Sequence, residues 1–352
     1  MEFTKYKLQE LMEVTRGMSL CGKHYATEGD LMRLTLGNFD YHNNCFKDDK
    51  SKDNLYFTGS VKKDFILNKD DIITPLTEQA IGLLGSTAKI PFSGKYIQSQ
   101  DVALIKCNEK LYPDFAFYLI SSKMVRFQLS AAAQQTKIRH TSPDKIKDCT
   151  VWVPEYSVQK KIGDLLTTID KKISINREIN RNLEELAKQI YDYWFVQFDF
   201  PNEDGKPYKS SGGKMVWNEL LKREIPAGWE VGILSDIAYI TMGQSPDGSS
   251  YNETGVGIIF YQGSTDFGIR FPTIRVYTTS PKRFAKKGDI LMSVRAPVGI
   301  LNIANHDCCI GRGLAALKSK VASMVHLWFT MEVFKQRFEG KNLSGTTFGA
   351  IT

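Results

Sequence analysis

The alternation of hydrophobic and polar positions is most regular between Ser157 and Trp194, near the middle of the chain. This segment contains no proline, and its one glycine, Gly163, falls in the first turns. Apolar side chains recur at spacings of three and four residues, at Ile162, Leu165, Ile169, Ile179, Leu183, Leu186 and Ile190. That spacing is typical of a helix that buries one narrow stripe against a partner helix. The pattern therefore predicts a long coiled-coil helix of about 57 Å.

Two polar residues, Lys172 and Asn176, occupy positions of the same stripe. Polar residues at such positions lower the stability of a helix pair but fix its register. We therefore expect the stripe, with Lys172, Asn176 and Trp194, to contact a partner helix or subunit. The alternative is a long core helix of a single globular domain, and the segments on either side of the helix argue against it.

Those flanking segments carry the same pattern twice. LQELMEVTRGMSL from Leu8 aligns without a gap with LSDIAYITMGQSP from Leu234. FILNKDDIITPL matches FAKKGDILMSV, AIGLLGSTA matches PVGILNIAN with Gly82 opposite Gly299, and DVALIKC matches GLAALKS. The helix-like PDFAFYLISS and SMVHLWFTME follow in the same order. A repeat of this length indicates duplicated domains.

Each copy mixes short β-rich runs with at least one helix, so the predicted fold class is α+β with two similar domains separated by a long spacer helix. The expected boundaries are 1–153 for the first domain, 154–198 for the spacer, 199–228 for a turn-rich connector and 229–352 for the second domain. The second copy stops at Thr352, one residue after the counterpart of Ile138. The sequence therefore predicts that a second spacer helix is absent.

Composition changes this picture only slightly. With 352 residues, 42% apolar and 24% charged, the chain resembles a soluble globular protein. A formal net charge of +7 favours an anionic partner. None of the six cysteines forms a Cys-x-x-Cys pair, and no apolar run is long enough to span a membrane. We expect a cytoplasmic protein with reduced thiols, without metal or membrane contact.

Three segments are similar to the specificity (S) subunits of type I restriction-modification systems. They are VPEYSVQKKIGDLLTTIDKKI, IYDYWFVQFDFPNEDGKPYKSSGGKMVWNELLKREIPAGWE and GDILMSVRAPVGILNIANHDCCIGRGLAAL. The resemblance implies two target-recognition domains that each read half of a split double-stranded DNA sequence. It also implies spacer helices that pair antiparallel and bind methyltransferase (modification) subunits, and a complex that includes a restriction and translocase subunit. S-adenosylmethionine, ATP and magnesium would bind those partners, and this chain would bind no cofactor.

Reading DNA requires cations for phosphates and planar polar side chains for base edges. In the first copy such residues are Lys23, His24, Tyr25, Arg33, Asn38, Tyr41, Asn43, Lys89, Tyr96, Gln98, Lys137 and Arg139. In the second copy they are Gln244, Ser245, Tyr251, Gln262, Ser264, Arg270, Arg275, Tyr277, Lys282, Arg283 and Arg295. We expect these groups to form the DNA-contacting surfaces.

No plausible nucleophile and base pair stands out in the sequence, so a DNA reader without catalytic activity is expected. Two alternatives remain open. One is a self-contained nuclease or DNA methyltransferase with an unrecognised site. The other is an assembly scaffold that never reads a sequence. The stripe on the spacer helix also leaves self-association open, since an apolar seam needs a cover.

Overall fold

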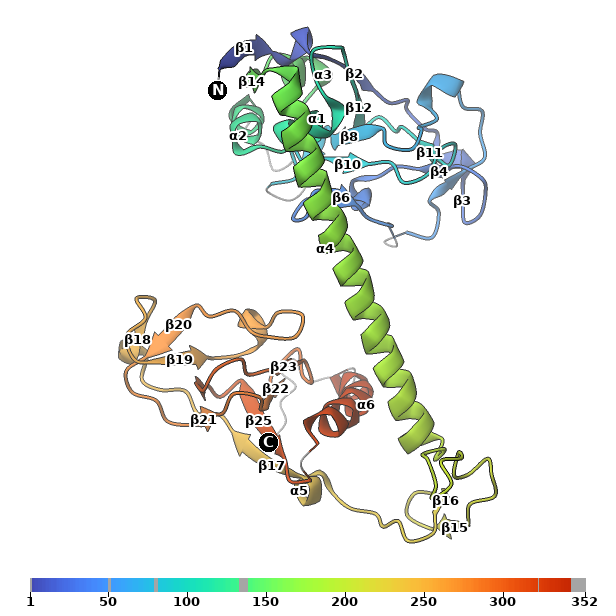
Figure 1. Cartoon of the computed structure of the whole chain (residues 1–352), viewed down its shortest axis with the longest axis vertical. Coiled ribbons are helices and arrows are strands. Elements are labelled where there is room, and N and C mark those ends of the chain that lie inside the picture. The colour runs from blue at the N-terminus through green and yellow to red at the C-terminus, as the bar shows by residue number, and fades with distance from the viewer. Residues whose placement is uncertain (1, 50–51, 79–81, 133–138, 322, 343–352) are drawn as a thin grey trace. The chain divides into compact units, whose positions relative to one another are not determined.

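The computed structural model describes residues 2–49, 52–78, 82–132, 139–321 and 323–342, and of residues 336–342 only the backbone. It separates into two compact units, Met1–Glu178 (unit 1) and Ile179–Thr352 (unit 2). The division falls inside a long helix, whose two halves pack on different units. Figure 1 labels the larger helices and many of the strands of each unit.

Unit 1 contains two four-stranded sheets. The first has the order β10 (Ala88–Lys89), β8 (Ile72–Pro75), β12 (Val102–Cys107) and β2 (Met12–Arg16). The second has the order β11 (Tyr96–Ile97), β4 (Met32–Arg33), β7 (Tyr56–Phe57) and β3 (Tyr25–Ala26). Two-stranded pairs complete the unit: β1 (Phe3–Lys7) with β14 (Thr150–Pro154), β5 (Phe39–Asp40) with β6 (Cys45–Phe46), and β9 (Thr77–Glu78) with β13 (Arg139–His140).

The strand β12 lies between two hydrophobic cores of unit 1. Ala103 and Ile105 belong to one cluster, while Val102 and Leu104 belong to the other. Successive side chains of a strand point to opposite faces, so a strand with both faces buried must be apolar without interruption. The helices are α1 (Pro113–Ile120), α2 (Lys123–Ala132) and α3 (Pro143–Lys147), with short 3-10 helices η1 (Leu8–Glu10), η2 (Gly22–His24), η3 (Leu36–Asn38) and η4 (Lys63–Phe65).

Unit 2 is built in the same way. One sheet has the order β17 (Ala238–Met242), β25 (Leu314–Ser319), β22 (Ile290–Ser293) and β23 (Leu301–Ile303). The other has the order β18 (Tyr251–Asn252), β20 (Val276–Thr278), β19 (Ile258–Tyr261), β24 (Cys308–Ile310) and β21 (Phe284–Ala285). Helices of this unit are α5 (Leu234–Ile237) and α6 (Met324–Asn342), with 3-10 helices η6 (Gly248–Ser250) and η7 (Ser264–Asp266).

The sheets of unit 2 repeat the strand order and register of unit 1. The order β10-β8-β12-β2 recurs as β23-β22-β25-β17. The pair Met12 and Cys107 of unit 1 corresponds to the pair Ala238 and Ser319 of unit 2. The second sheets also agree, since β11-β4-β7-β3 recurs as β24-β19-β20-β18 with a parallel pair in the same place. The repeat predicted from the sequence is therefore present in the fold.

One detail of the predicted alignment needs correction. Gly82 and Gly299 both have positive φ, 99° and 85°, as expected for matched glycines at a turn. The next strands, however, pair Ala88 with Ile73 in unit 1 and Asn302 with Leu291 in unit 2. The loop that follows the matched glycine is therefore longer in unit 1, and the gapless match does not extend through it.

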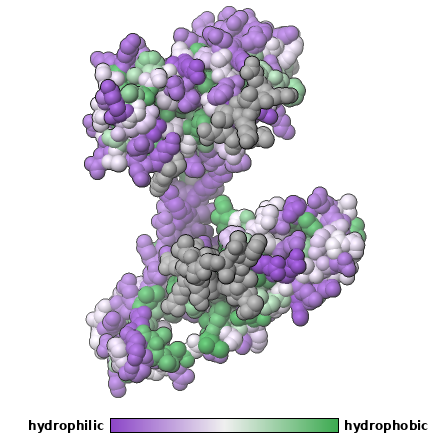
Figure 2. All heavy atoms as spheres, turned by 180° about the vertical axis from the view of Figure 1, so that it is seen from behind, coloured by the Kyte–Doolittle hydropathy of each residue, from purple (hydrophilic) through white to green (hydrophobic). Residues whose placement is uncertain are grey.

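The predicted long helix is α4 (Tyr156–Tyr191), which continues as a π-helical turn, η5 (Asp192–Val196). Every residue from 168 to 186 is exposed. A helix in the core of a single globular domain would bury these residues, so that alternative is wrong. The face of α4 visible in Figure 2 is largely hydrophilic.

The segment after α4 is an ordered connector and not a flexible linker. Its hairpin pairs β15 (Met215–Asn218) with β16 (Arg223–Pro226). The ring of Phe200 stacks on Tyr208, at 4.8 Å between centroids, and on Trp229, at 5.3 Å. The rings of Phe200, Tyr208 and Trp229 thus pack on one another.

Candidate functional site

Each unit has a cleft beside a tyrosine that directly follows a 3-10 turn. In unit 1 the Tyr25 hydroxyl donates to the carbonyl oxygen of Leu20 at 3.2 Å. In unit 2 the Tyr251 hydroxyl donates to the carbonyl oxygen of Pro246 at 3.0 Å. The two hydrogen bonds link positions with the same separation along the chain, after η2 and η6 respectively. The same turn therefore fixes the tyrosine ring in both units.

The backbone around these turns is also the same in both units. The amides of Gly17 and Gly243 donate to the carbonyls of Val102 and Leu314, at 3.3 and 2.9 Å. A Cβ atom at Gly17 would overlap the carbonyl oxygen of Ser99, and one at Gly243 would overlap the carbonyl oxygen of Gly311. Both glycines are therefore required by a close approach of two backbone segments. We call these backbone contacts of Gly17 or Gly243, together with the anchored tyrosine, the frame of the cleft. The same frame is present in both units.

The cleft of unit 2 has a volume of about 330 Å³ and contains a charged pair. Arg275 donates from Nε to Oδ1 of Asp266 at 2.9 Å. The side chain of Asp266 is 7% exposed, whereas that of Arg275 is 55% exposed. Gln262 and Tyr251 line the same cleft. A buried carboxylate thus holds an exposed guanidinium beside planar polar groups.

The cleft of unit 1 is larger, about 470 Å³, and its arginine is arranged differently. Arg33 is 8% exposed, and its Nε and Nη2 atoms donate to the carbonyl oxygen of Asn54. Its guanidinium carbon lies 4.0 Å from the centre of the Tyr25 ring. Among the charged residues that line this cleft, Lys47 and Lys52 are exposed, whereas Asp49 is 8% exposed and accepts from the hydroxyl of Thr35 at 2.5 Å. The two clefts therefore share a frame but differ in chemistry.

Four of the residues predicted to contact DNA are instead buried in unit 1. Arg33, Asn38, Tyr96 and Gln98 are 8%, 0%, 6% and 1% exposed. Asn38 and Gln98 donate from their side-chain amides to backbone carbonyls of unit 1. Since DNA cannot reach them in this structure, these residues hold the fold in place.

Besides Arg275, three other predicted cations form ion pairs within their own unit. Lys89 pairs with Asp114 at 2.5 Å, and Arg139 lies 3.6 Å from the buried Glu78. Arg270 pairs with Glu184 at 2.7 Å and lies 4.5 Å from the centre of the Trp328 ring. Arg270 is therefore part of the contact between α4 and unit 2, and it is not a free cation for a phosphate.

The other predicted residues lie at least partly exposed. They are Lys23, His24, Tyr25, Tyr41, Asn43, Gln244, Ser245, Tyr251, Gln262, Ser264, Arg275, Tyr277, Lys282, Arg283 and Arg295. Lys137 lies outside the described residues. The structure brings Tyr251, Gln262 and Arg275 together in one cleft, and their contact with DNA stays a prediction.

The first half of α4 is docked on unit 1. A Cβ atom at Gly163 would lie 2.8 Å from the backbone nitrogen of Phe115, so only glycine permits this close crossing with α1. The Tyr112 hydroxyl donates to Asp164 at 2.7 Å, and this bond lowers the pKa of the Asp164 carboxyl. Close packing against α1 thus explains why a glycine occupies this position in the first turns of the helix.

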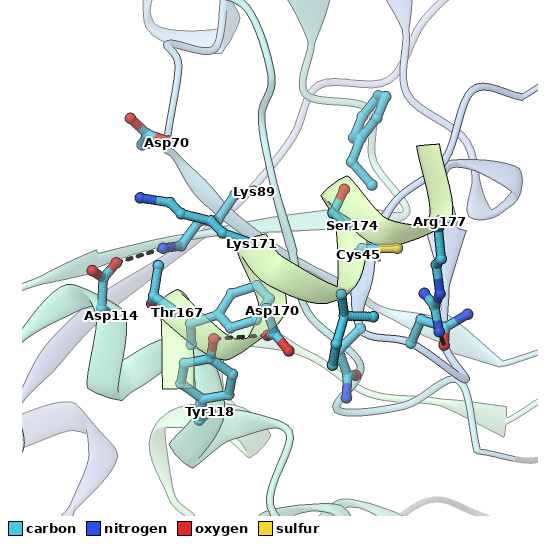
Figure 3. Close-up of a pocket in the computed structure, with 15 residues that line it drawn as sticks. Cys45, Asp70, Lys89, Asp114, Tyr118, Thr167, Asp170, Lys171, Ser174 and Arg177 are labelled. Atoms are coloured by element: carbon cyan, nitrogen blue, oxygen red, sulfur yellow. Dashed lines mark hydrogen bonds and ion pairs between the residues drawn. The ribbon is translucent and has the colours of Figure 1, made fainter. Parts of the chain in front are cut away.

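A polar cavity of about 690 Å³ lies beside this contact (Figure 3). The Tyr118 hydroxyl donates to Asp170 at 2.7 Å, and Nη2 of Arg177 donates to Oδ1 of Asn43 at 2.9 Å. Burial raises the pKa of Tyr118, and the bond to Asp170 raises it further. These contacts join α4 to α1 and to the loop that contains Asn43.

The second half of α4 is docked on unit 2. Besides the pair of Glu184 with Arg270, the hydroxyls of Tyr191 and Thr330 lie 3.1 Å apart. His326 packs on the ring of Phe195 at 4.7 Å between centroids, and burial lowers the pKa of His326. An aromatic contact between α6 and the end of α4 therefore replaces the mainly polar contact of unit 1.

The docking residues of α4 were missed by the sequence interpretation, although a signal exists. Asp170, Arg177, Glu184 and Tyr191 recur every seven residues, so each occupies the same position of the heptad. The apolar seam occupies two other heptad positions. Its members Leu165, Ile169, Ile179, Leu183, Leu186 and Ile190 are 42% to 61% exposed, Ile162 is half-buried, and Lys172 and Asn176 are exposed. Trp194 lies outside these two positions and is 37% exposed. Among the described residues, the contacts of α4 within each unit thus leave most of the seam exposed.

Neither a metal centre nor a membrane segment is found in the part of the chain that the structure describes. No group of three or more His, Cys, Asp or Glu side chains there could hold a metal ion. Among the same residues, every helix is too short or too polar to cross a bilayer.

Comparison with known proteins gives consistent results. A putative type I restriction enzyme MjaX specificity subunit from Methanocaldococcus jannaschii is 33% identical over 266 residues, which cover 73% of this chain and 59% of that protein. The type I restriction enzyme MjaIX specificity subunit from the same organism is 24% identical over 199 residues, 53% of this chain and 44% of that protein. This chain therefore spans about half the length of these relatives.

A crystal structure of the type I restriction-modification system S subunit from M. genitalium matches the whole chain and 85% of its own length, with a TM-score of 0.58 and 15% identity. That likeness shows the fold alone. Residues 1–185, more than half of the chain, match the model of the type I restriction modification DNA specificity domain. The chain therefore belongs to the family of type I restriction modification DNA specificity proteins.

Proposed function

We propose that this chain is the DNA-reading specificity subunit of a type I restriction-modification complex, and that unit 1 and unit 2 act as target-recognition domains that each read one half of a bipartite sequence. The observation that carries the proposal is a repeated frame with unlike clefts. Gly17, Tyr25, Gly243 and Tyr251 recur in position and contact, whereas the charged groups in the two clefts differ. Two readers of different half-sites need this combination, because common residues cannot distinguish two sequences.

The basic balance of the chain supports an anionic partner. The formal net charge is +7, and Lys23, Lys282, Arg283 and Arg295 are exposed cations. Contacts of such side chains with phosphates provide sequence-independent affinity, and side chains in the clefts would provide the discrimination between bases.

In this proposal the chain performs no catalysis. Methylation of adenine and ATP-driven cleavage belong to methyltransferase and restriction subunits, which would bind S-adenosylmethionine, ATP and magnesium. This chain would supply the sequence to be read and the surface on which the methyltransferase docks.

The spacer helix α4 provides that surface. Its seam exposes a row of large apolar side chains in the part of the chain that the structure describes. Burying such a side chain fully contributes roughly 1.5–3 kcal/mol, so leaving a whole seam in water is costly. We propose that a second copy, packed antiparallel about a two-fold axis, covers the seam when the chain is alone. Helices of the methyltransferase subunit replace it at least in part in the complex.

Methylome sequencing of a host that carries this chain with its modification subunit tests the proposal. The expected result is adenine methylation in a motif with two specific halves and an unspecified gap. Methylation without a split motif would contradict it and favour a non-reading scaffold. Incubating the purified chain alone with DNA, S-adenosylmethionine and magnesium tests the alternative that the chain is itself an enzyme. A non-catalytic DNA reader leaves the DNA unchanged, whereas a nuclease or methyltransferase cleaves or methylates it.

A further inference from the structure

The cleft of unit 2 presents an arginine in a fixed orientation. Arg275 is exposed, yet its Nε atom is held at 2.9 Å by Asp266, whose side chain is only 7% exposed. Among the described residues, Asp266 is the hydrogen-bond partner of this side chain. The two terminal nitrogens of the guanidinium therefore remain available at the mouth of the cleft.

This arrangement suits a base edge better than a phosphate. The negative charge of Asp266 balances the positive charge of Arg275, which weakens a long-range attraction for the DNA backbone. The same carboxylate limits the rotation of the side chain before DNA arrives, so less freedom is lost on binding. Because its charge is offset and its orientation is fixed, Arg275 would bind a phosphate only weakly. It is better suited to donate hydrogen bonds in a fixed direction.

The donor pattern of the free edge identifies the base. A guanidinium that approaches a base pair in the major groove donates two parallel hydrogen bonds to O6 and N7 of guanine. Cytosine presents a donor in that groove, and adenine presents a donor beside its N7, so neither accepts both bonds. Guanine is therefore the base that fits the edge of Arg275.

Unit 1 provides an internal comparison. Its cleft lies beside Tyr25, which is anchored as Tyr251 is anchored in unit 2. Its arginine, Arg33, is 8% exposed and donates to Asn54, so it does not present a free edge. The arginine edge is thus a property of unit 2, as expected of a group that distinguishes one half-site from the other.

We propose that Arg275 reads one guanine in the half-site of unit 2, and that Asp266 is the positioning residue that orients it. This inference rests on the proposed function and deepens it. Unit 1 contributes no equivalent contact through Arg33, so the dependence on Arg275 is confined to one base of one half-site.

The test uses the full chain with its modification subunit and a pool of random duplex DNA. The wild type first defines the bound motif. Duplexes with each of the four bases at every specific position then measure relative affinity for the wild type, Arg275→Lys, Arg275→Ala and Asp266→Asn. Lys287→Ala is the matched control, because it removes one exposed positive charge from the same unit outside the cleft. Thermal melting verifies that each variant is folded.

The wild type should prefer guanine at one position of the second half-site by about tenfold to a hundredfold. Arg275→Lys keeps the charge but loses the paired donors, so this preference should fall while the other positions are unchanged. Asp266→Asn should lower the same preference at the same position, which a merely structural role would not do. Lys287→Ala should leave the preference intact.

Two results would overturn the inference while leaving the proposed function in place. One is an unchanged guanine preference in Arg275→Lys. The other is a uniform loss of affinity for all sequences in Arg275→Ala that equals the loss in Lys287→Ala, since that result would make Arg275 a phosphate contact. If the wild type selects no motif at all, the proposed function itself fails.

Discussion

Unit 1 and unit 2 have the same frame and different surfaces. In β12 and β25, alternate residues point into two separate cores, with Ala103 and Ala315 at matching positions. The cleft beside Tyr25 is nevertheless lined by two exposed lysines, Lys47 and Lys52, and a buried arginine, whereas the cleft beside Tyr251 presents an arginine edge. The comparison teaches that buried positions preserve the duplication, because packing restricts them, whereas exposed cleft positions are free to diverge.

The units also differ in how they dock on α4. Unit 1 uses polar contacts from Tyr118 and Asn43 and the close crossing at Gly163. Unit 2 uses the Arg270 ion pair and an aromatic cluster around His326. The contact with unit 2 therefore depends on a titratable ring, and the contact with unit 1 depends on a glycine.

Exchange of one unit should have the largest effect. Replacing residues 1–150 with the corresponding unit of another family member should change one half of the methylated motif completely and leave the other half intact. The reason is that each unit has its own cleft and its own cores. Methylome sequencing measures the motif. A change in both halves, or in neither, would show that the units do not read separately.

The apolar seam of α4 runs through both units, and we expect the part in each unit to be needed for self-association. Ile169→Asp with Leu183→Asp places charge on two residues that are 44% and 57% exposed, one in each unit. This variant should abolish self-association, because a buried unpaired charge is strongly unfavourable. It should also abolish recruitment of the methyltransferase.

Light scattering at micromolar concentration measures the first effect, with a dimer expected for the wild type. Arg181→Asp is the control, since it changes the charge of α4 at an exposed position outside the seam. A wild-type chain that stays a soluble monomer would disprove pairing through the seam.

The repeated frame can be tested with one matched pair of substitutions. Gly17→Ala and Gly243→Ala each place a Cβ atom against a backbone carbonyl, of Ser99 and Gly311 respectively. Each should lower the free energy of unfolding by on the order of 1–3 kcal/mol. Gly248→Ala is the control, because a Cβ there has no neighbour within 4 Å. Denaturant titration gives the values, and a large loss at only one of the two glycines would mean that the frames are not equivalent.

The smallest expected effect is a pH dependence of unit 2. Burial beside Tyr191 and Phe195 lowers the pKa of His326 below its ordinary value of 6.5. As the pH falls, His326 is therefore protonated in the unfolded state before it is protonated in the folded state. Its contribution to stability is full above pH 6.5 and is lost as the pH falls through the lower pKa of the folded state.

Thermal melting between pH 7 and pH 5 should therefore show a loss of stability that is smaller in His326→Phe. His306→Gln is the control, since His306 lies outside this aromatic cluster. Equal pH dependence in His326→Phe and in the wild type would exclude His326 as the cause.

The sequence by itself determined the features that depend on local periodicity. The heptad spacing and the absence of proline predicted α4, because a helix is specified by residues three and four positions apart. The duplication was also visible, since Gly17 and Gly243 and their neighbours align without a gap. The sequence also singled out Gly163, because it is the one glycine of the long predicted helix.

Only the tertiary structure decided which polar residues are free. Asn38, Tyr96 and Gln98 look like DNA contacts in the sequence but are buried, and Arg270 is engaged by Glu184, 86 positions away. The pair of Asp266 with Arg275 follows no periodic pattern either. Burial and ion pairing are set by segments that meet only when the chain folds, and the hydrophobic pattern of one segment contains no information about the polar partners of another.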